Sequence, residues 1–296
     1  MNELVVISGK GGTGKTSVVA ALSRLAGRSV LADCDVDAAD LHLVMSPEPG
    51  EPHEFSGRSQ AVADPERCTS CGLCVEHCRF SALSLDPLRV DGIACEGCGL
   101  CTRICPEEAL SMQPVINGEW RVSRTDWGPL VHAALGIAED NSGKLVTLVR
   151  AEARRVADEA GLDLILVDGS RGIGCPVIAS LSGASMVLVV TEPTIAGRHD
   201  LGRVLGLVQH FHLPFAVCIN KYDLNAEMAQ EIEAGASEAG ARFVARIRHD
   251  RAVTDAMVAG KSVIDRSREG AAADLIEMWT QLSDELQAVA MEAQGR

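Results

Sequence analysis

A glycine-rich segment near the amino terminus has the residue types that bind the phosphates of a nucleotide. Gly9 to Thr16 reads G-K-G-G-T-G-K-T and fits G-x-x-x-x-G-K-[ST], between a strand-like and a helix-like run. Glycines let backbone N–H groups converge on phosphate oxygens, and the start of a helix adds partial positive charge. We expect Lys15 to pair the β- and γ-phosphates and Thr16 to bind Mg²⁺. The predicted nucleotide-binding residues are Gly9, Gly11, Gly12, Thr13, Gly14, Lys15, Thr16 and Ser17.

Eight of the eleven cysteines form two runs that share one spacing. The first run is Cys68-x₂-Cys71-x₂-Cys74-x₃-Cys78, and the second contains Cys95, Cys98, Cys101 and Cys105 followed by Pro106. Zinc, the alternative for C-x₂-C pairs, suits four cysteines at this spacing poorly. The runs resemble those of bacterial two-cluster ferredoxins. That resemblance implies two [4Fe–4S] clusters, one held by Cys68, Cys71, Cys74 and Cys105, the other by Cys95, Cys98, Cys101 and Cys78.

The lysine inside the glycine-rich segment points to a family. With Lys10, the sequence K-G-G-T-G-K-T resembles the deviant phosphate loop (Walker A) of the ParA/MinD/nitrogenase-iron-protein superfamily. The resemblance implies ATP hydrolysis, slow without a partner, and a homodimer that forms on ATP binding. It also implies that Lys10 reaches the phosphates of the other subunit. The alternative is that Lys10 screens the phosphates of its own subunit.

Four acidic or amide positions carry further expectations. The D-x-D switch of this superfamily is similar to the segment Asp33-Cys34-Asp35-Val36-Asp37. The resemblance implies that Asp35 positions the attacking water. For Asp37 or Asp40, the alternative is that the side chain caps the next helix. Asp168 ends a buried strand-like run and is expected to hold Mg²⁺ through water. By the resemblance, Asn220 binds the adenine edge. Asn220 to Asp223 also spells the guanine-reading N-K-x-D, so GTP stays open as an alternative to ATP.

Outside the two runs, Cys175 lies in a segment that resembles the second switch of these ATPases. Nitrogenase iron protein has a cluster-bridging cysteine in a similar place. A dimer would offer two such thiolates, and a third cluster would need a further ligand. A lone cysteine is otherwise a small apolar residue, and this is the interpretation of Cys34 and Cys218.

Composition limits the partners and the compartment. The net charge of −14 argues against non-specific binding to nucleic acid. No apolar run reaches the roughly 20 residues that span a bilayer, and the chain starts with a strand-like run in place of a leader. The polar face of the amphipathic segment Ala271 to Gln294 is acidic, which favours packing on the core over binding to anionic lipid. We therefore expect a cytoplasmic protein with no nucleic-acid or membrane partner.

The pattern of elements around these sites predicts an α/β fold. Apolar runs at Leu162 to Asp168, Met186 to Thr191 and Phe215 to Asn220 alternate with helical patterns, and aromatic residues make up 3% of the chain. We expect a doubly wound, mostly parallel P-loop NTPase sheet built from 1–63 and 115–296, with an inserted α+β ferredoxin-like module at 64–114.

Two local expectations complete the pattern. The stretch from Ser46 to Pro65 is rich in proline, glycine and charge, and predicts a linker. Leu130 to Leu135 and Lys144 to Ala160 are both predicted as helices.

Three functions are compatible with these residues. In the first, a nucleotide-dependent dimer switch acts on a two-cluster electron-transfer module and a redox partner protein. In the second, the chain is an ATP-dependent carrier or scaffold that delivers iron–sulfur clusters to a partner. In the third, it is a positioning ATPase whose clusters are structural. The absence of a C-x-x-C pair outside the two runs favours retained clusters over transferred ones.

Overall fold

The computed structural model describes residues 1–36, 38–136 and 142–294, and these residues form two compact units. The described part of the larger unit is 1–36, 38–53, 120–134 and 142–294. The described part of the smaller unit is Glu54–Glu119 with Leu135 and Gly136. Asp37 lies outside the described residues, so its predicted capping role stays a prediction.

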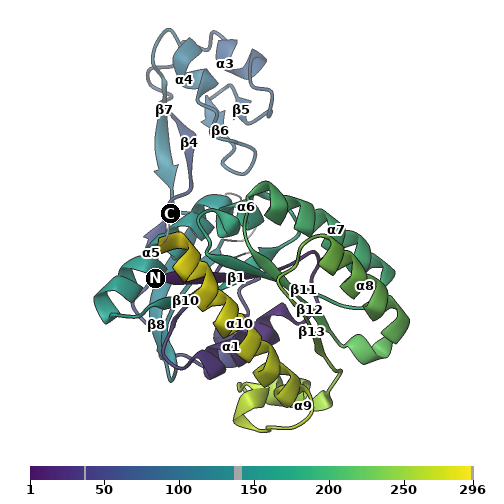
Figure 1. The fold of residues 1–296 in the computed structure, drawn as a ribbon. Coiled ribbons are helices and arrows are strands. Elements are labelled where there is room, and N and C mark those ends of the chain that lie inside the picture. Colours follow the sequence, from purple (N-terminus) through teal and green to yellow (C-terminus); the bar gives the residue numbers. More distant parts are fainter. Residues whose placement is uncertain (37, 137–141, 295–296) are drawn as a thin grey trace. The chain divides into compact units, whose positions relative to one another are not determined.

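A nine-stranded sheet forms the centre of the larger unit, in the order β13-β12-β11-β1-β10-β2-β9-β8-β3 (Figure 1). All neighbours from β13 to β9 pair in parallel. The prediction of a mostly parallel, doubly wound sheet is confirmed. The strands are β1 (Asn2–Ser8), β2 (Val30–Asp33), β3 (His53–Phe55), β8 (Gly118–Thr125), β9 (Gly128–Leu135), β10 (Leu164–Arg171), β11 (Met186–Thr191), β12 (Phe215–Asn220) and β13 (Val244–Ile247).

The central strands consist of continuous apolar runs because both faces of the sheet are covered. Val5 of β1 pairs with Val167 of β10 on one side and with Val187 of β11 on the other, and all three are fully buried. The chain leaves β1 toward β2 in one direction and passes from β11 to β13 in the other. A ligand site is expected where the carboxyl ends of the strands meet at such a reversal.

Helices cover the sheet on both sides, as Figure 1 shows for α1 and α10 on one face and α6, α7 and α8 on the other. Helices α1 and α10 pack on each other and on β1, while α5 and α6 pack on each other and on β10. No helix of the described residues is long and apolar enough to cross a bilayer. The helices of this unit are α1 (Lys15–Ala26), α2 (Leu41–Met45), α5 (Ser142–Ala160), α6 (Cys175–Leu181), α7 (Ile195–His210), α8 (Ala226–Glu238), α9 (Arg251–Val258) and α10 (Ala271–Gln294), with 3₁₀ turns η1 (Tyr222–Leu224) and η2 (Val263–Asp265).

Two local predictions were wrong. The segment from Leu130 to Leu135 is part of strand β9, and Leu130 pairs with Leu31 of β2. A short apolar run does not distinguish a strand from a helix by periodicity, and here pairing with β2 decides. The predicted linker from Ser46 to Pro65 contains strands β3 and β4 (Arg58–Ala63), whose backbone groups pair with other strands.

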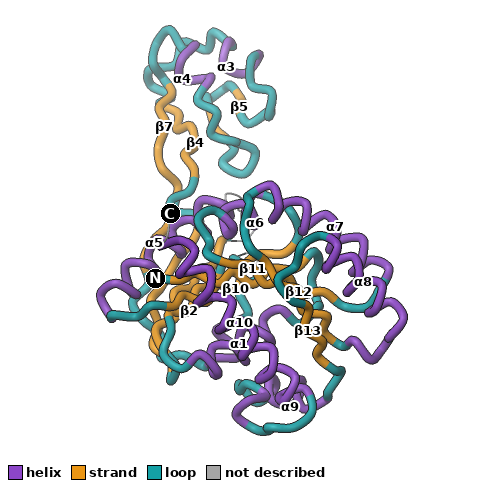
Figure 2. The backbone as a smooth tube through the Cα atoms, in the orientation of Figure 1, coloured by secondary structure: helices purple, strands orange, loops and turns teal. Residues whose placement is uncertain are grey.

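The smaller unit consists of two short helices and two small sheets (Figure 2). Ala61, Leu83, Leu88 and Leu110 form its core, and cysteine side chains pack around them. Each short helix follows a glycine in the left-handed region, Gly72 or Gly99. The elements are β4 (Arg58–Ala63), α3 (Leu73–Glu76), β5 (Leu83–Ser84), β6 (Arg89–Val90), α4 (Leu100–Ile104) and β7 (Leu110–Val115), with β4 antiparallel to β7 and β5 antiparallel to β6.

Candidate functional site

The glycine-rich loop lies at the carboxyl end of β1, and helix α1 begins with Lys15. Gly14, which precedes the helix, has φ 89°, a left-handed conformation that a side chain would strain. A Cβ atom at this position would also collide with the amide of Asn220. The hydroxyl of Ser17, in the first turn, donates to the sulfur of Met257 at 2.6 Å. The local backbone is therefore fixed by glycine at the point where a phosphate loop must approach its ligand.

Lys15 lies among buried acids from two neighbouring strands, β10 and β2 with the turn that follows β2. Its ammonium forms an ion pair with Asp168, and Asp35 Oδ2 lies 3.4 Å from Lys15 Nζ. Burial lowers the pKa of Lys15, but the negative charges of Asp168 and Asp35 outweigh this effect and the net pKa is raised. The structure thus brings together three residues that are predicted to bind phosphate, Mg²⁺ and the attacking water.

Asp33 has a different environment from Asp35. Its carboxylate is fully buried and accepts the backbone N–H groups of Asp35 and Leu41, each at 3.2 Å. Burial, followed by the charge of Asp168, raises its pKa to about 8. Asp33 therefore orders the turn that carries Asp35.

Two buried polar atoms beside Lys15 have no hydrogen-bond partner among the described residues: Thr13 Oγ1 and Asp168 Oδ2. Leaving such atoms unpaired costs free energy, so they indicate a place for a ligand. The acceptor Asp168 Oδ2 suits Mg²⁺ or its bound water, which are oxygen-ligated, and Thr13 Oγ1 suits a phosphate oxygen. The residues present therefore fit a Mg²⁺–nucleotide, with Thr16 in the adjoining helical turn.

Lys10 is held by acceptors of its own chain, at the end of strand β11. Its Nζ lies 2.5 Å from Glu192 Oε1 and 3.3 Å from Thr194 Oγ1. Lys221 Nζ lies 3.4 Å from the other oxygen of Glu192. Partial burial alone would raise the pKa of Glu192, but the two ammonium groups outweigh it and the pKa is lowered. Glu192 was not among the predicted residues, because its role depends on spatial proximity to the loop.

The residues after β12 face the same loop. Asn220 Nδ2 donates to the carbonyl oxygen of Thr13 at 2.7 Å, and Lys221 Nζ donates to that of Gly12 at 3.2 Å. Asp223 is exposed, and its Oδ1 accepts the backbone N–H of His249 at 2.6 Å. Of the two predicted base-binding residues, Asn220 therefore lies beside the phosphate loop, whereas Asp223 contacts His249 before α9. Cys175, by contrast, is the exposed first residue of α6.

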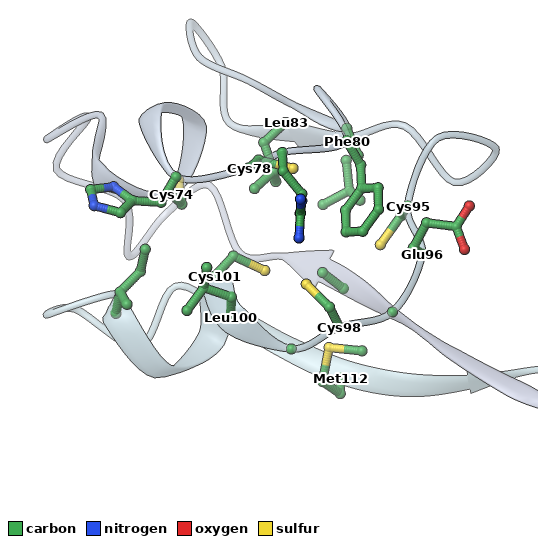
Figure 3. A pocket seen from close by; sticks show the side chains of 18 residues that line it. Cys74, Cys78, Phe80, Leu83, Cys95, Glu96, Cys98, Leu100, Cys101 and Met112 are labelled. Atoms are coloured by element: carbon green, nitrogen blue, oxygen red, sulfur yellow. The ribbon is translucent and has the colours of Figure 1, made fainter.

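The cysteines of the smaller unit line two cavities. One, of about 270 Å³, is lined by Cys78, Cys95, Cys98 and Cys101, and by Cys74 at its edge. Figure 3 shows the sulfur atoms of Cys78, Cys95, Cys98 and Cys101 directed into one space. The second cavity is lined by Cys68, Cys71, Cys74 and Cys105, so Cys74 borders both cavities.

Cysteines of both runs line each of the two cavities. No group of three or more His, Cys, Asp or Glu in the described residues is arranged to hold a metal ion. The cavity beside Cys78, Cys95, Cys98 and Cys101 has a volume of about 270 Å³, whereas the one beside Cys68, Cys71, Cys74 and Cys105 has only about 10 Å³. Burial raises the pKa of the Cys74 and Cys101 thiols.

Comparisons with known proteins agree with the geometry of the loop. Residues 4–263 match the CobQ/CobB/MinD/ParA nucleotide binding domain. The uncharacterized protein MJ0578 of Methanocaldococcus jannaschii is 30% identical over 229 residues, which cover 75% of this chain and 79% of that protein.

Solved structures show the same fold at lower identity. The cell division ATPase MinD of Pyrococcus furiosus superposes with a TM-score of 0.58 at 19% identity, covering 96% of this chain and 98% of that one. The septum site-determining protein MinD of Pyrococcus horikoshii, complexed with Mg-ADP, has a TM-score of 0.55 at 17% identity, covering 98% and 97%.

Proposed function

The chain belongs to the CobQ/CobB/MinD/ParA nucleotide-binding family, and from this we propose that it is an ATPase switch coupled to a two-cluster [4Fe–4S] electron-transfer module. ATP with Mg²⁺ would occupy the loop site, and a homodimer would form on ATP binding. Lys15 would bind the β- and γ-phosphates, Thr16 and Asp168 would hold Mg²⁺, and Asp35 would position the attacking water. Lys10 would leave Glu192 and reach the phosphates across the dimer.

One observation carries the redox part of the proposal. The eight cysteines of the two runs line two cavities, and the sets are those that two-cluster ferredoxins use: Cys68, Cys71, Cys74, Cys105 and Cys95, Cys98, Cys101, Cys78. In each set, three cysteines come from one run and the fourth from the other. Bound clusters would supply one-electron transfer, and residues 64–114 would be the domain that holds them.

The protein environment can protect clusters at these sites. Cys74 is buried, and Cys68, Cys78, Cys95, Cys101 and Cys105 are partly buried, whereas Cys71 and Cys98 are exposed. Arg58 donates to the carbonyl oxygen of Cys95 at 3.1 Å and so fixes the backbone at the start of the second run. Ligands that are mostly enclosed favour retention of clusters over release to an acceptor.

The test is an anaerobic redox titration followed by EPR, with and without ATP and Mg²⁺. We expect two reducible four-iron clusters per chain and a midpoint potential that shifts when nucleotide binds. Asp168→Asn serves as the matched variant, because it should keep its clusters and lose the shift. If the midpoint potentials do not change with nucleotide and the clusters are transferred to an apo-ferredoxin, the result would contradict the electron-transfer switch and support the carrier function. Clusters that are neither reducible nor transferred would indicate a structural role in a positioning ATPase.

A further inference from the structure

Arg171, the last residue of strand β10, lies against the phosphate loop. A Cβ atom on Gly11 would lie 2.8 Å from Arg171 Nη1 and 3.6 Å from Arg171 Cδ. The first distance is too short for a normal contact, so glycine at this position leaves the room that the guanidinium occupies. The positive charge of Arg171 therefore lies directly on the loop backbone, at the residue that follows Lys10.

A shift in register between β1 and β10 turns Arg171 toward the site. Val6 pairs with Asp168, but Ser8 pairs with Arg171, so two steps along β1 match three steps along β10. Side chains alternate between the two faces of a strand, and one extra residue turns the next side chain to the other face. Arg171 therefore shares the face of Asp168, the residue predicted to hold Mg²⁺.

The backbone around Arg171 is bonded to both neighbouring segments. The N–H of Gly172 donates to the carbonyl oxygen of Ser8 at 2.8 Å, directly before the loop. The buried hydroxyl of Ser170 donates to the carbonyl oxygen of Cys34 at 2.6 Å, in the turn after β2. The point from which the arginine side chain extends is therefore fixed relative to the loop and to this turn.

Arg171 differs from the other cations of the loop site in its charge partners. Lys10 and Lys15 form ion pairs with carboxylates, and Lys221 Nζ lies 3.4 Å from Glu192 Oε2. The exposed guanidinium of Arg171 has no hydrogen-bond or ion-pair partner in the described part of the chain. Guanidinium has five N–H donors in a planar fork that matches phosphate oxygens. A phosphate group can therefore bind Arg171 without displacing a carboxylate from it.

We propose that Arg171 binds the γ-phosphate of ATP within its own subunit, so that the site distinguishes ATP from ADP. Lys15 and the loop N–H groups would hold the β-phosphate of either nucleotide, whereas a side chain from outside the loop can respond to the third phosphate alone. Arg171 comes from the strand and face of Asp168, and Mg²⁺ bridges the β- and γ-phosphates in P-loop enzymes. The inference rests on the proposed function only in requiring that the loop binds Mg²⁺–ATP. Two plainer roles compete with it: the guanidinium fixes the loop, or it stays in solvent.

The experiment is displacement of a fluorescent ADP analogue from the full-length protein by ADP or by the non-hydrolysable ATP analogue AMP-PNP, with Mg²⁺. The protein is kept at a concentration at which sedimentation shows monomers. Arg171→Gln should weaken AMP-PNP by about 10- to 100-fold, the range for hydrogen bonds to a charged group, and ADP by less than about threefold. Arg171→Lys keeps the charge and loses the planar fork, so it should weaken AMP-PNP by about 3- to 10-fold. The matched control is Arg28→Gln, an exposed arginine before β2 at the opposite end of the parallel strands, which should change neither nucleotide.

Every other outcome contradicts the proposal. Equal weakening of AMP-PNP and ADP in Arg171→Gln would show that the guanidinium fixes the loop, and no change in either would leave it a solvated side chain. A selective loss of AMP-PNP that appears only at concentrations where dimers form would assign Arg171 to a contact across the subunit interface. None of these three results contradicts nucleotide binding by the loop. Failure of the unaltered protein to bind both ADP and AMP-PNP would instead overturn the proposed function itself.

Discussion

Replacing Asp168 with asparagine should have little effect on the stability of the ligand-free protein and should remove most of its stabilisation by Mg²⁺–nucleotide. The buried site contains one ammonium, Lys15, and three carboxylates, Asp33, Asp35 and Asp168. Breaking an isolated buried ion pair costs about 3–5 kcal/mol, because one charge is left uncompensated. Here Lys15 keeps Asp35 at 3.4 Å, and the negative charge of the buried site falls by one unit.

These opposing terms set the magnitude. We expect the unfolding free energy of ligand-free Asp168→Asn to change by at most about 1 kcal/mol, or about 2–4 °C in Tm for a unit of this size. In the unaltered protein, Mg²⁺–ATP at 100 times its Kd should add about 2.7 kcal/mol, which is about 5–10 °C. The variant should gain less than about a third of this, since Asp168 Oδ2 is the unpartnered acceptor available to the metal.

Calorimetric scans with and without Mg²⁺–ATP measure both quantities in one experiment. The matched control is Asp163→Asn, an exposed acid just before β10, which should behave as the unaltered protein. A ligand-free Tm loss of about 6 °C or more in Asp168→Asn would refute the reasoning that the cluster has surplus negative charge. A full response of that variant to Mg²⁺–ATP would refute the assignment of Asp168 to the metal.

Three further predictions follow from the same contacts. Glu192→Gln removes the partly buried charge that holds Lys10, which should release Lys10 for the second subunit. Mg²⁺–ATP should then dimerise the variant at a protein concentration roughly 1.5- to 5-fold lower than for the unaltered protein, as measured by sedimentation. Equal dimerisation of the two proteins would contradict the release of Lys10. Because burial raises the pKa of Asp33 from 3.8 to about 8, its stabilising contribution is full below pH 3.8 and is lost as the pH rises through 8. In chemical denaturation, the unfolding free energy of the ligand-free protein should thus fall from pH 6 to pH 8.5. Asp33→Asn should lessen this fall. A steeper fall in the variant would contradict the raised pKa of Asp33. Cys78→Ser and Cys105→Ser each remove one ligand, from different cysteine sets. The iron content of each single variant should therefore fall from about eight to about four atoms per chain. Eight iron atoms in both variants would show that these two cysteines are not ligands.

The central strands could be predicted from the sequence because both faces of each strand are buried, so its residues form a continuous apolar run. Strands β11 and β12 are apolar up to their last residues, Thr191 and Asn220. The predicted runs Met186 to Thr191 and Phe215 to Asn220 have the observed bounds. The helix predicted at Ala271 to Gln294 also has the observed bounds and packs on the core. Strand β9 was not predictable in this way, because its apolar run is short and its pairing with β2 depends on chain distant in sequence.

The candidate site likewise contains residues that the local sequence predicts and residues that only the strand order brings together. Lys15 and its loop are local in sequence, so a spacing rule finds them. The acids and amides at strand ends are found less completely, because the order of strands decides which ends are neighbours. Glu192 follows β11, which pairs with β1, and this brings it to Lys10 across 182 positions of sequence. The local sequence shows only that Glu192 is an acid directly after a buried strand. In a predicted parallel sheet, that position at the carboxyl end of a strand could have been proposed as part of the ligand site.

The ligand-free contacts explain how nucleotide binding could change both loop lysines together. Lys15 is paired with acids of its own chain, and Lys10 is paired with Glu192. Phosphates would replace the acids around Lys15, and Mg²⁺ would take the carboxylate that Lys15 leaves, so every charge in the buried site would keep a partner. Lys10 differs because its pair is partly exposed and easily exchanged. Its release should therefore cost little, and in the proposed dimer the phosphate charge of the second subunit would compete with Glu192 for Lys10.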